Sequence, residues 1–194
     1  VEISTIIKGG EIVDENWLKD FHYELKDETL LQTVKNEKIT KEAIALSKKE
    51  LNDVMELVPN QLLTIHRKEI IPDENEQFVP NSTYCKLVVV ERHGKNGCIG
   101  VCPIKGYNIV NGAVATTVSH DSHNIIAVGD NDEDIVCAVN KLREIKGGYV
   151  IASDGKVVDV LPLSIAGLIS TDTADNVQKQ TGKMVEIARQ MGVP

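Results

Sequence analysis

Six consecutive polar residues interrupt an otherwise apolar stretch of this chain, and their side chains are well suited to chemistry. The run is Ser119-His120-Asp121-Ser122-His123-Asn124, and it lies between the apolar segments 112–118 and 125–128. Such side chains either line a site or lie in water, because burying polar groups without partners is unfavourable. The run is therefore the first candidate for a functional site.

The chemistry of this run has more than one interpretation. The spacing His120-x-x-His123 occurs in metal sites, with Asp121 as a further ligand or as a group that orients an imidazole. On a strand or loop, however, residues three apart point in different directions, so we favour binding or positioning of a polar substrate over a metal site. The alternative without a function is a hydrogen-bonded turn in which Ser119 and Asp121 satisfy backbone groups.

A second polar cluster, Glu91-Arg92-His93-Gly94, follows an apolar strand. Strand ends often carry functional side chains, because the sheet fixes the backbone while the adjoining loop admits a ligand. The alternative is that Glu91 and Arg92 are solvated and that His93 is a turn residue. Both interpretations stay open at this point.

Other residues that resemble metal ligands have simpler explanations. The acidic run 131–134 suits the first turn of a helix, where the macrodipole favours negative charge. The cysteines Cys85, Cys98, Cys102 and Cys137 contain no Cys-x-x-Cys pair, so we interpret them as reduced thiols, mostly buried. We therefore expect no metal site in this chain.

Composition restricts the class of protein. The 194 residues are 42% apolar, enough for a substantial core, and 21 basic against 29 acidic residues give a net charge of −8. No basic stripe is present, so nucleic acid is not an expected partner. No apolar run approaches the roughly 18 residues of a membrane span, and the N-terminus carries no targeting signal. We expect a cytoplasmic protein that does not enter a membrane.

The hydrophobic pattern predicts the elements that position these residues. Residues 3–7 and 12–13, around Gly9-Gly10, predict a short strand pair, and 14–38 a linker with a possible short helix. Further predictions are a helix over 41–52, with Thr40 as a possible cap, strands over 54–58, 62–71 and 85–91, helices over 132–146 and 173–191, and a hairpin over 149–153 and 156–161.

Three dipeptides are typical of hairpin turns: Asn96-Gly97, Asn111-Gly112 and Asp154-Gly155. The segment 162–170 is apolar and rich in small residues, which favours a buried segment or a subunit contact. Together these patterns predict an α+β fold, a layered domain in which helices pack on a mixed, largely antiparallel β-sheet, with the short strand pair preceding it.

Several motifs follow one another along the chain. They are Glu91-Arg92-His93-Gly94, Gly100, Lys105-Gly106, the run 112–126, Gly129 with Asn131-Asp132-Glu133-Asp134, Ala138-Val139-Asn140, Gly147-Gly148 and Leu161-Pro162-Leu163-Ser164-Ile165-Ala166-Gly167-Leu168. In this order they closely resemble the C-terminal domain of bacterial adenine deaminases, in the amidohydrolase superfamily. The resemblance covers about residues 54–192. Cys98, Cys102 and Pro103 depart from it, where glycines or aliphatic residues are common.

The resemblance implies a domain division and an activity. Residues 1–13 resemble the strand pair that returns to the small β-sandwich after an amidohydrolase barrel, so 1–38 is expected to be the end of that sandwich with a linker, and 39–194 the C-terminal domain. The family hydrolyses adenine to hypoxanthine and ammonia, in purine salvage, on a metal-bearing barrel of about 250 residues. No His-x-His motif of such a barrel occurs here, so this chain is expected to be a part of the enzyme that is inactive alone.

The resemblance also implies partners and site residues. A divalent metal (manganese, iron or zinc) is expected in the missing barrel, adenine is the substrate of the complete enzyme, and the protein is expected to be a homo-oligomer. His120, Asp121 and His123 are the expected catalytic residues. The expected substrate-binding residues are Ser119, Ser122, Asn124, Glu91, Arg92 and His93. The alternative is a structural or oligomerisation domain with no catalytic residue, and an autonomous metal-binding module ranks last.

Overall fold

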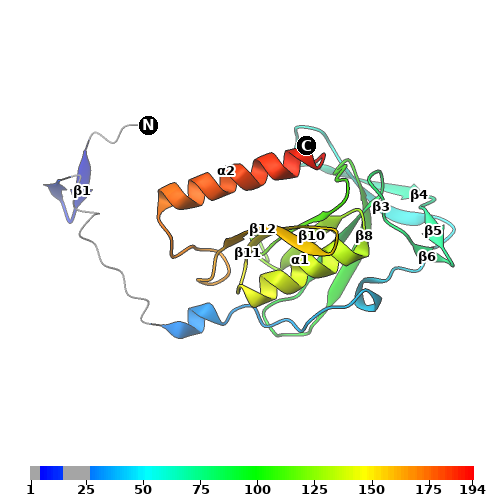
Figure 1. The fold of residues 1–194 in the computed structure, drawn as a ribbon, viewed down its shortest axis with the longest axis horizontal. Helices are drawn as coiled ribbons and strands as arrows, with labels where there is room; N and C mark the ends of the chain where they lie inside the picture. The colour runs from blue at the N-terminus through cyan, green and yellow to red at the C-terminus, as the bar shows by residue number, and fades with distance from the viewer. Residues whose placement is uncertain (1–4, 15–26) are drawn as a thin grey trace.

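A computed structural model describes residues 5–14 and 27–194. An eight-stranded sheet forms the centre of the fold (Figure 1), with the strand order β12-β11-β9-β10-β7-β8-β3-β4. Its strands are β3 (Asn52–Leu57), β4 (Thr64–Glu69), β7 (Cys85–Val90), β8 (Ile99–Lys105), β9 (Ala113–Thr116), β10 (Ile125–Gly129), β11 (Gly148–Ser153) and β12 (Lys156–Pro162). Neighbouring strands are antiparallel except β3 and β8, which run parallel. The predicted α+β fold with a mixed, largely antiparallel sheet is confirmed.

Two helices cover opposite faces of this sheet, and Figure 1 shows β11 and β12 between them. Helix α1 (Asp132–Glu144) packs on the face that carries Val150 and Ala152, whereas α2 (Ala174–Gln190) packs on the face of Ile151. Because side chains alternate along a strand, these residues point to opposite sides. The result is a layered domain with a core on each face of the sheet.

Helix α1 begins where the sequence predicts. The side chain of Asn131 accepts the Asp134 backbone N–H at 2.8 Å, which caps the helix, and acidic residues fill the first turn. Ile135, Ala138, Val139 and Leu142 are buried against the sheet. Since β10 and β11 are both antiparallel to β9, they run parallel to each other, and α1 is the crossover between them.

Helix α2 is more exposed than α1. Thr173 caps it by accepting the Asn176 N–H at 3.3 Å, and of its described residues only Met184 is buried. The prediction of a helix over 173–191 is confirmed within a residue or two. In the described ranges, no helix is long and apolar enough to cross a bilayer.

The predicted helix over 41–52 is wrong. Only a three-residue 3-10 helix, η3 (Glu42–Ile44), forms, and Thr40 does not cap it. The chain then runs extended past the small hairpin β5 (Asp73–Glu74) and β6 (Gln77–Phe78), where Phe78 donates its N–H to the Leu46 carbonyl at 2.8 Å. Ile44 is fully buried in the core of the α1 face. Tertiary pairing thus overrides a thin helical stripe.

The hairpin turns were predicted in part. Asn96-Gly97 lies between the paired strands β7 and β8, and Asp154-Gly155 joins β11 to β12. Asn111-Gly112 is not a hairpin turn, because it leads from β8 to β9, which are not neighbours in the sheet. Gly112 is required there by close packing, since a Cβ would lie 2.5 Å from the Ala152 carbonyl oxygen.

The N-terminal strand pair is confirmed in its described part, as β1 (Ile6–Lys8) and β2 (Glu11–Val13) pair around Gly9-Gly10. Of the predicted linker, residues 15–26 lie outside the described residues, and 27–38 contains a short 3-10 helix, η2 (Glu28–Leu31). The segment 162–170 is buried only in part, since Leu163 and Ile165 are buried but Ile169 is exposed. The four cysteines are free thiols, yet of these only Cys85 is buried.

Candidate functional site

The two polar clusters of the sequence meet at one end of the sheet. The run 119–124 is the loop that joins β9 to β10, and 91–94 directly follows β7. Strands β7 and β10 pair so that Val90 lies opposite Ile125, which brings the two clusters together. The structure therefore unites residues that are about 30 positions apart in the sequence.

Hydrogen bonds connect the clusters directly. Arg92 donates from its Nε to the carbonyl oxygen of His123. The Nε2 of His93 lies 2.9 Å from the carbonyl oxygen of Ser122. Because a carbonyl oxygen only accepts hydrogen bonds, Nε2 of His93 is the donor in this contact and carries a proton. In a neutral imidazole, Nδ1 is then the nitrogen that can accept. The side chains of Arg92 and His93 thus hold the backbone of the 119–124 loop.

Glu91 shapes the loop that follows it. Its carboxylate accepts four backbone N–H groups, from His93 at 2.5 Å and from Lys95, Asn96 and Gly97 at 3.0 to 3.2 Å. Desolvation alone would raise the pKa of Glu91, but these N–H groups bind the charged form and lower the pKa to about 2. Glu91 is therefore ionised at neutral pH and is held by backbone groups of its own loop.

The outer part of the 119–124 loop is open to solvent. The side chains of His120 and Asp121 are 80% and 100% exposed, and Nδ1 of His120 lies 2.7 Å from an Asp121 carboxylate oxygen. When Nδ1 donates its proton to this carboxylate, Nε2 of His120 is left with no partner among the described residues. The ring centroids of His120 and His123 are 5.0 Å apart. An imidazole oriented by a carboxylate is an arrangement that can accept or donate a proton.

The inner part of the loop contains two buried polar atoms that find no partner in the described part of the chain. The Ser119 carbonyl accepts the His123 N–H at 2.6 Å, and the Ser122 hydroxyl accepts the Asn124 N–H at 3.4 Å. Nδ1 of His123 and Oδ1 of Asn124 are buried, and neither has a hydrogen-bond partner among residues 5–14 and 27–194. Such atoms are available to a ligand or a water molecule.

The divalent metal that the resemblance implies is expected in the barrel outside this chain, and the described residues do not gather a set of ligands for it. Across 5–14 and 27–194, no group of three or more His, Cys, Asp or Glu side chains is arranged to hold a metal ion. The Sγ of Cys102 contacts the carbonyl oxygens of Asp53 and Pro103, and Cys98 is exposed. We therefore assign no chemical step to a metal held by these residues.

Sequence patterns missed the residues that support the loop from behind. Thr117 is fully buried, and its hydroxyl donates to the Gly167 carbonyl at 2.6 Å and accepts the Gly148 N–H at 2.8 Å. Gly148 and Gly167 have positive φ values, 133° and 71°. The glycines were the only signal in the sequence, since a threonine in an apolar strand suggests nothing beyond β-propensity.

Comparison with known proteins gives a consistent result. A sequence model of the adenine deaminase C-terminal domain matches residues 61–194. Proteins named adenine deaminase match at 43% identity over 143 residues in Desulfitobacterium hafniense and at 35% over 192 residues in Clostridium acetobutylicum. These matches cover 74% and 96% of this chain but only 25% and 34% of the relatives.

The chain thus spans about a quarter to a third of the length of these relatives. A shorter match to the adenine deaminase of Brucella anthropi reaches 50% identity over 107 residues, which is 55% of this chain and 19% of that protein. Because the family match extends over residues 61–194, more than half of the sequence, this chain belongs to the family of adenine deaminase C-terminal domains.

Proposed function

We propose that this chain is the C-terminal portion of an adenine deaminase, a hydrolase that converts adenine to hypoxanthine and ammonia in purine salvage. We propose further that its 119–124 loop contributes to the active site. The observation that carries the proposal is the meeting of the two polar clusters at one end of the sheet, with His120 and Asp121 exposed. The relatives named adenine deaminase supply the reaction class.

In this proposal the exposed groups of the loop handle protons. His120, oriented by Asp121, exchanges a proton with a purine nitrogen or with the departing ammonia through its free ring nitrogen. His123 is the second imidazole, 5.0 Å from the first, and its Nδ1 has no partner in the described residues. The divalent metal (manganese, iron or zinc) belongs to the barrel outside this chain.

The remaining polar groups are proposed to contact the substrate. Adenine presents ring nitrogens that accept hydrogen bonds and an amino group that donates them. Ser119, Ser122 and Asn124 offer hydroxyl and amide groups of both kinds, and His93 adds a ring nitrogen. Glu91 and Arg92 are committed to backbone groups, so their proposed contribution is to shape the loops that carry the others.

A second candidate function is a structural or oligomerisation domain. The buried network of Thr117 favours it, because such networks stabilise a fold without any ligand. Under either function we propose a cytoplasmic homo-oligomer that binds no nucleic acid and no membrane. The acidic net charge of −8 supports the statement about nucleic acid.

Alanine variants of the loop separate the two functions. In the longest product of the gene, His120→Ala is expected to lower turnover of adenine by about 100-fold, the scale of lost acid–base help, with little change in melting temperature. His66→Ala is the matched control, because His66 is also exposed and paired with a carboxylate, Asp53, but lies on the edge strand β4. Normal turnover with a lower melting temperature in His120→Ala would assign the loop to the structural function.

A further inference from the structure

Arg92 is a buried arginine whose hydrogen-bond partners among the described residues are neutral oxygen atoms. It is 2% exposed. Besides the His123 carbonyl, its guanidinium donates from Nη1 to the Thr33 hydroxyl at 3.1 Å and from Nη2 to the Ala166 carbonyl at 3.1 Å. In the part of the chain that the structure describes, no carboxylate forms an ion pair with it.

A charge in this position needs a reason. Burying a cation is unfavourable unless hydrogen bonds replace its water, and neutral carbonyls compensate it less well than a carboxylate. Burial lowers the pKa of Arg92, but a guanidinium still remains protonated at neutral pH. A methionine or leucine would fill the space without a charge. The feature that only arginine supplies is a rigid fork of donors that reaches several acceptors at once.

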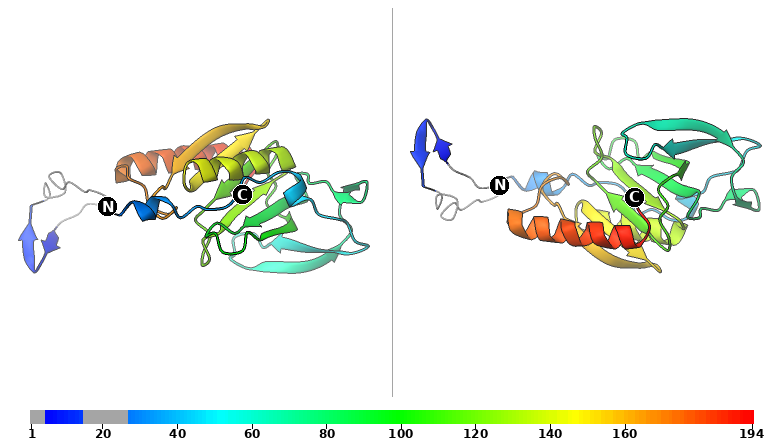
Figure 2. Two further views of the ribbon diagram at one scale, coloured as in Figure 1. Left: turned by 90° about the horizontal axis from the view of Figure 1, so that it is seen from below. Right: turned by 90° about the horizontal axis from the view of Figure 1, so that it is seen from above.

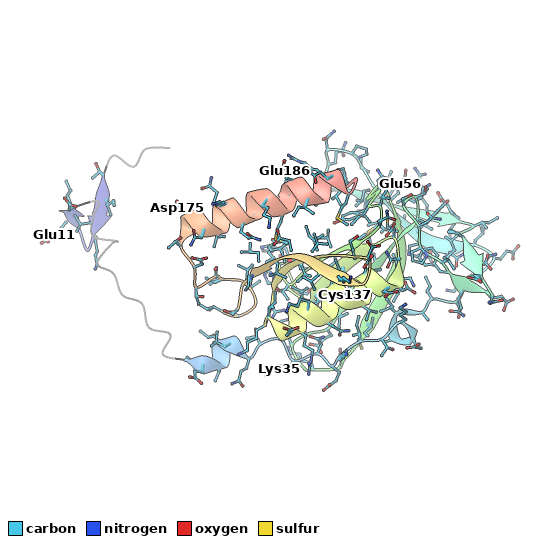
Figure 3. All side chains as sticks on the ribbon, viewed as in Figure 1. Glu11, Lys35, Glu56, Cys137, Asp175 and Glu186 are labelled. Carbon is cyan, nitrogen blue, oxygen red and sulfur yellow. The ribbon has the colours of Figure 1, made fainter. Side chains whose placement is uncertain are left out.

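The acceptors of this fork come from separate parts of the chain. Thr33 belongs to the segment before η3, His123 to the polar loop, and Ala166 to the apolar segment 162–170. The backbone of Arg92 adds a further connection, since Lys35, labelled in Figure 3, donates its N–H to the Arg92 carbonyl at 2.7 Å. Arg92 thus joins these segments at one point.

Gly167 shows how closely the chain packs on the guanidinium. A Cβ at this residue would lie 2.8 Å from Nη1 of Arg92 and 3.1 Å from its central carbon. Gly167 has a φ of 71°, a backbone conformation that residues other than glycine rarely adopt. The apolar segment is therefore shaped to surround the fork.

We propose that Arg92 is a positioning residue of the candidate site, which sets the His123 peptide and through it the imidazoles of the loop. In this proposal Arg92 does not contact substrate. The sequence analysis expected Arg92 to bind substrate directly, and the positioning role takes the place of that expectation. The reason is geometric: a side chain 2% exposed, with donors directed at His123, Thr33 and Ala166, holds backbone rather than ligand. Its consequence for turnover rests on the proposed function of the loop.

The first test measures the loop itself. Arg92→Met removes the donors and leaves buried carbonyls without partners, so we expect hydrogen exchange of peptides covering 117–125 to accelerate at least 10-fold, while α1 is unchanged. Lys86→Met is the matched control, because it removes another buried cation, on β7, whose contacts, Asp132 and Ile44, lie away from the loop. Arg92→Lys, which keeps a buried charge without the fork, gives the same readout if Arg92→Met does not fold.

The second test measures turnover of adenine in the longest product of the gene. Arg92→Lys and Gly167→Ala are expected to lower kcat by about 10-fold or more, because misplaced imidazoles lose rate. A raised KM with normal kcat would indicate direct substrate contact and would overturn the proposal. Unchanged exchange of 117–125 in both Arg92 variants would overturn it as well.

His120→Ala distinguishes failure of this proposal from failure of the proposed function. If the Arg92 variants loosen the loop and keep normal turnover while His120→Ala is impaired, Arg92 is not a positioning residue and the loop remains in the site. If His120→Ala also keeps normal turnover, the proposed function of the loop fails, and the positioning role for the reaction fails with it.

Discussion

The ammonium of Lys86 lies 2.6 Å from a carboxylate oxygen of Asp132, which connects β7 to the first turn of α1. The lysine side chain is fully buried, and it also donates to the Ile44 carbonyl at 3.2 Å and lies 5.5 Å from the Phe78 ring centroid. Lys86 thus links the sheet to helix α1 and to the short 3-10 helix η3.

Removing the lysine of this pair should destabilise the fold. Lys86→Ala leaves the partly buried Asp132 carboxylate unpaired and opens a cavity, so we expect a loss of roughly 3 kcal/mol in the free energy of unfolding. Urea denaturation followed by circular dichroism measures it. The double variant Lys86→Met with Asp132→Leu should regain much of the loss, and a loss below about 1 kcal/mol in Lys86→Ala would show that the pair is not a stabilising contact.

The hydroxyl of Thr117 should matter more than its methyl group. Thr117→Val keeps the shape but leaves the Gly148 N–H and the Gly167 carbonyl unsatisfied in the interior, so we expect a loss of about 2 to 4 kcal/mol. Thr117→Ser keeps the hydroxyl and should lose only about 1 kcal/mol. The same denaturation experiment compares them, and equal losses would mean that packing, not hydrogen bonding, dominates at this position.

Glu91 should contribute a pH-dependent stability. Its folded pKa is about 2, below its ordinary value of 4.5, so its contribution is complete above about pH 4.5 and is lost as the pH falls towards 2. Glu91→Gln should therefore lower the melting temperature at pH 7, and the gap to the unmodified protein should narrow below pH 4.5. Melting curves across this range provide the measurement. A gap that stays constant with pH would contradict the assigned hydrogen bonds.

The 194-residue chain by itself should lack adenine deaminase activity. The proposed function places the metal-bearing barrel outside this chain. The chain covers only 25% of the length of the Desulfitobacterium hafniense relative and 34% of the Clostridium acetobutylicum relative. We expect cooperative thermal unfolding but no release of ammonia from adenine, with manganese, iron or zinc added. The adenine deaminase of Clostridium acetobutylicum serves as the positive control. Ammonia release at an enzymatic rate by the chain alone would refute the proposal.

Local sequence patterns predicted the elements that local physics determines. Helix α1 carries a cap, an acidic first turn and an apolar stripe, and each of these agrees with the others. The sequence signals for the strand β7 and for the hairpin of β11 and β12 are similarly strong. The prediction for the segment 41–52 failed because its structure depends on pairing with residues 76–78. Local sequence patterns carry no information about such a distant pairing.

The candidate site was predicted as residues but not as an arrangement. The polar types in 119–124 and 91–94 were visible, whereas their meeting depends on the pairing of β7 with β10. The burial of Lys86 and Arg92 could not be predicted from the sequence either, since lysine and arginine side chains are normally exposed to solvent. Thr33 and Ala166 contribute a hydroxyl and a carbonyl to Arg92, and neither has a sequence signature.

The two outer strands of the sheet have a consequence for the behaviour of this protein at high concentration. On β4, visible in cyan in Figure 2, His66, Arg67 and Lys68 place ionisable groups along the free edge. On β12, the Val160 N–H is bound by Asp159 and its carbonyl by Gln180. Edges guarded in these ways resist the addition of another strand, so neighbouring copies should not aggregate by joining their sheets into fibrils.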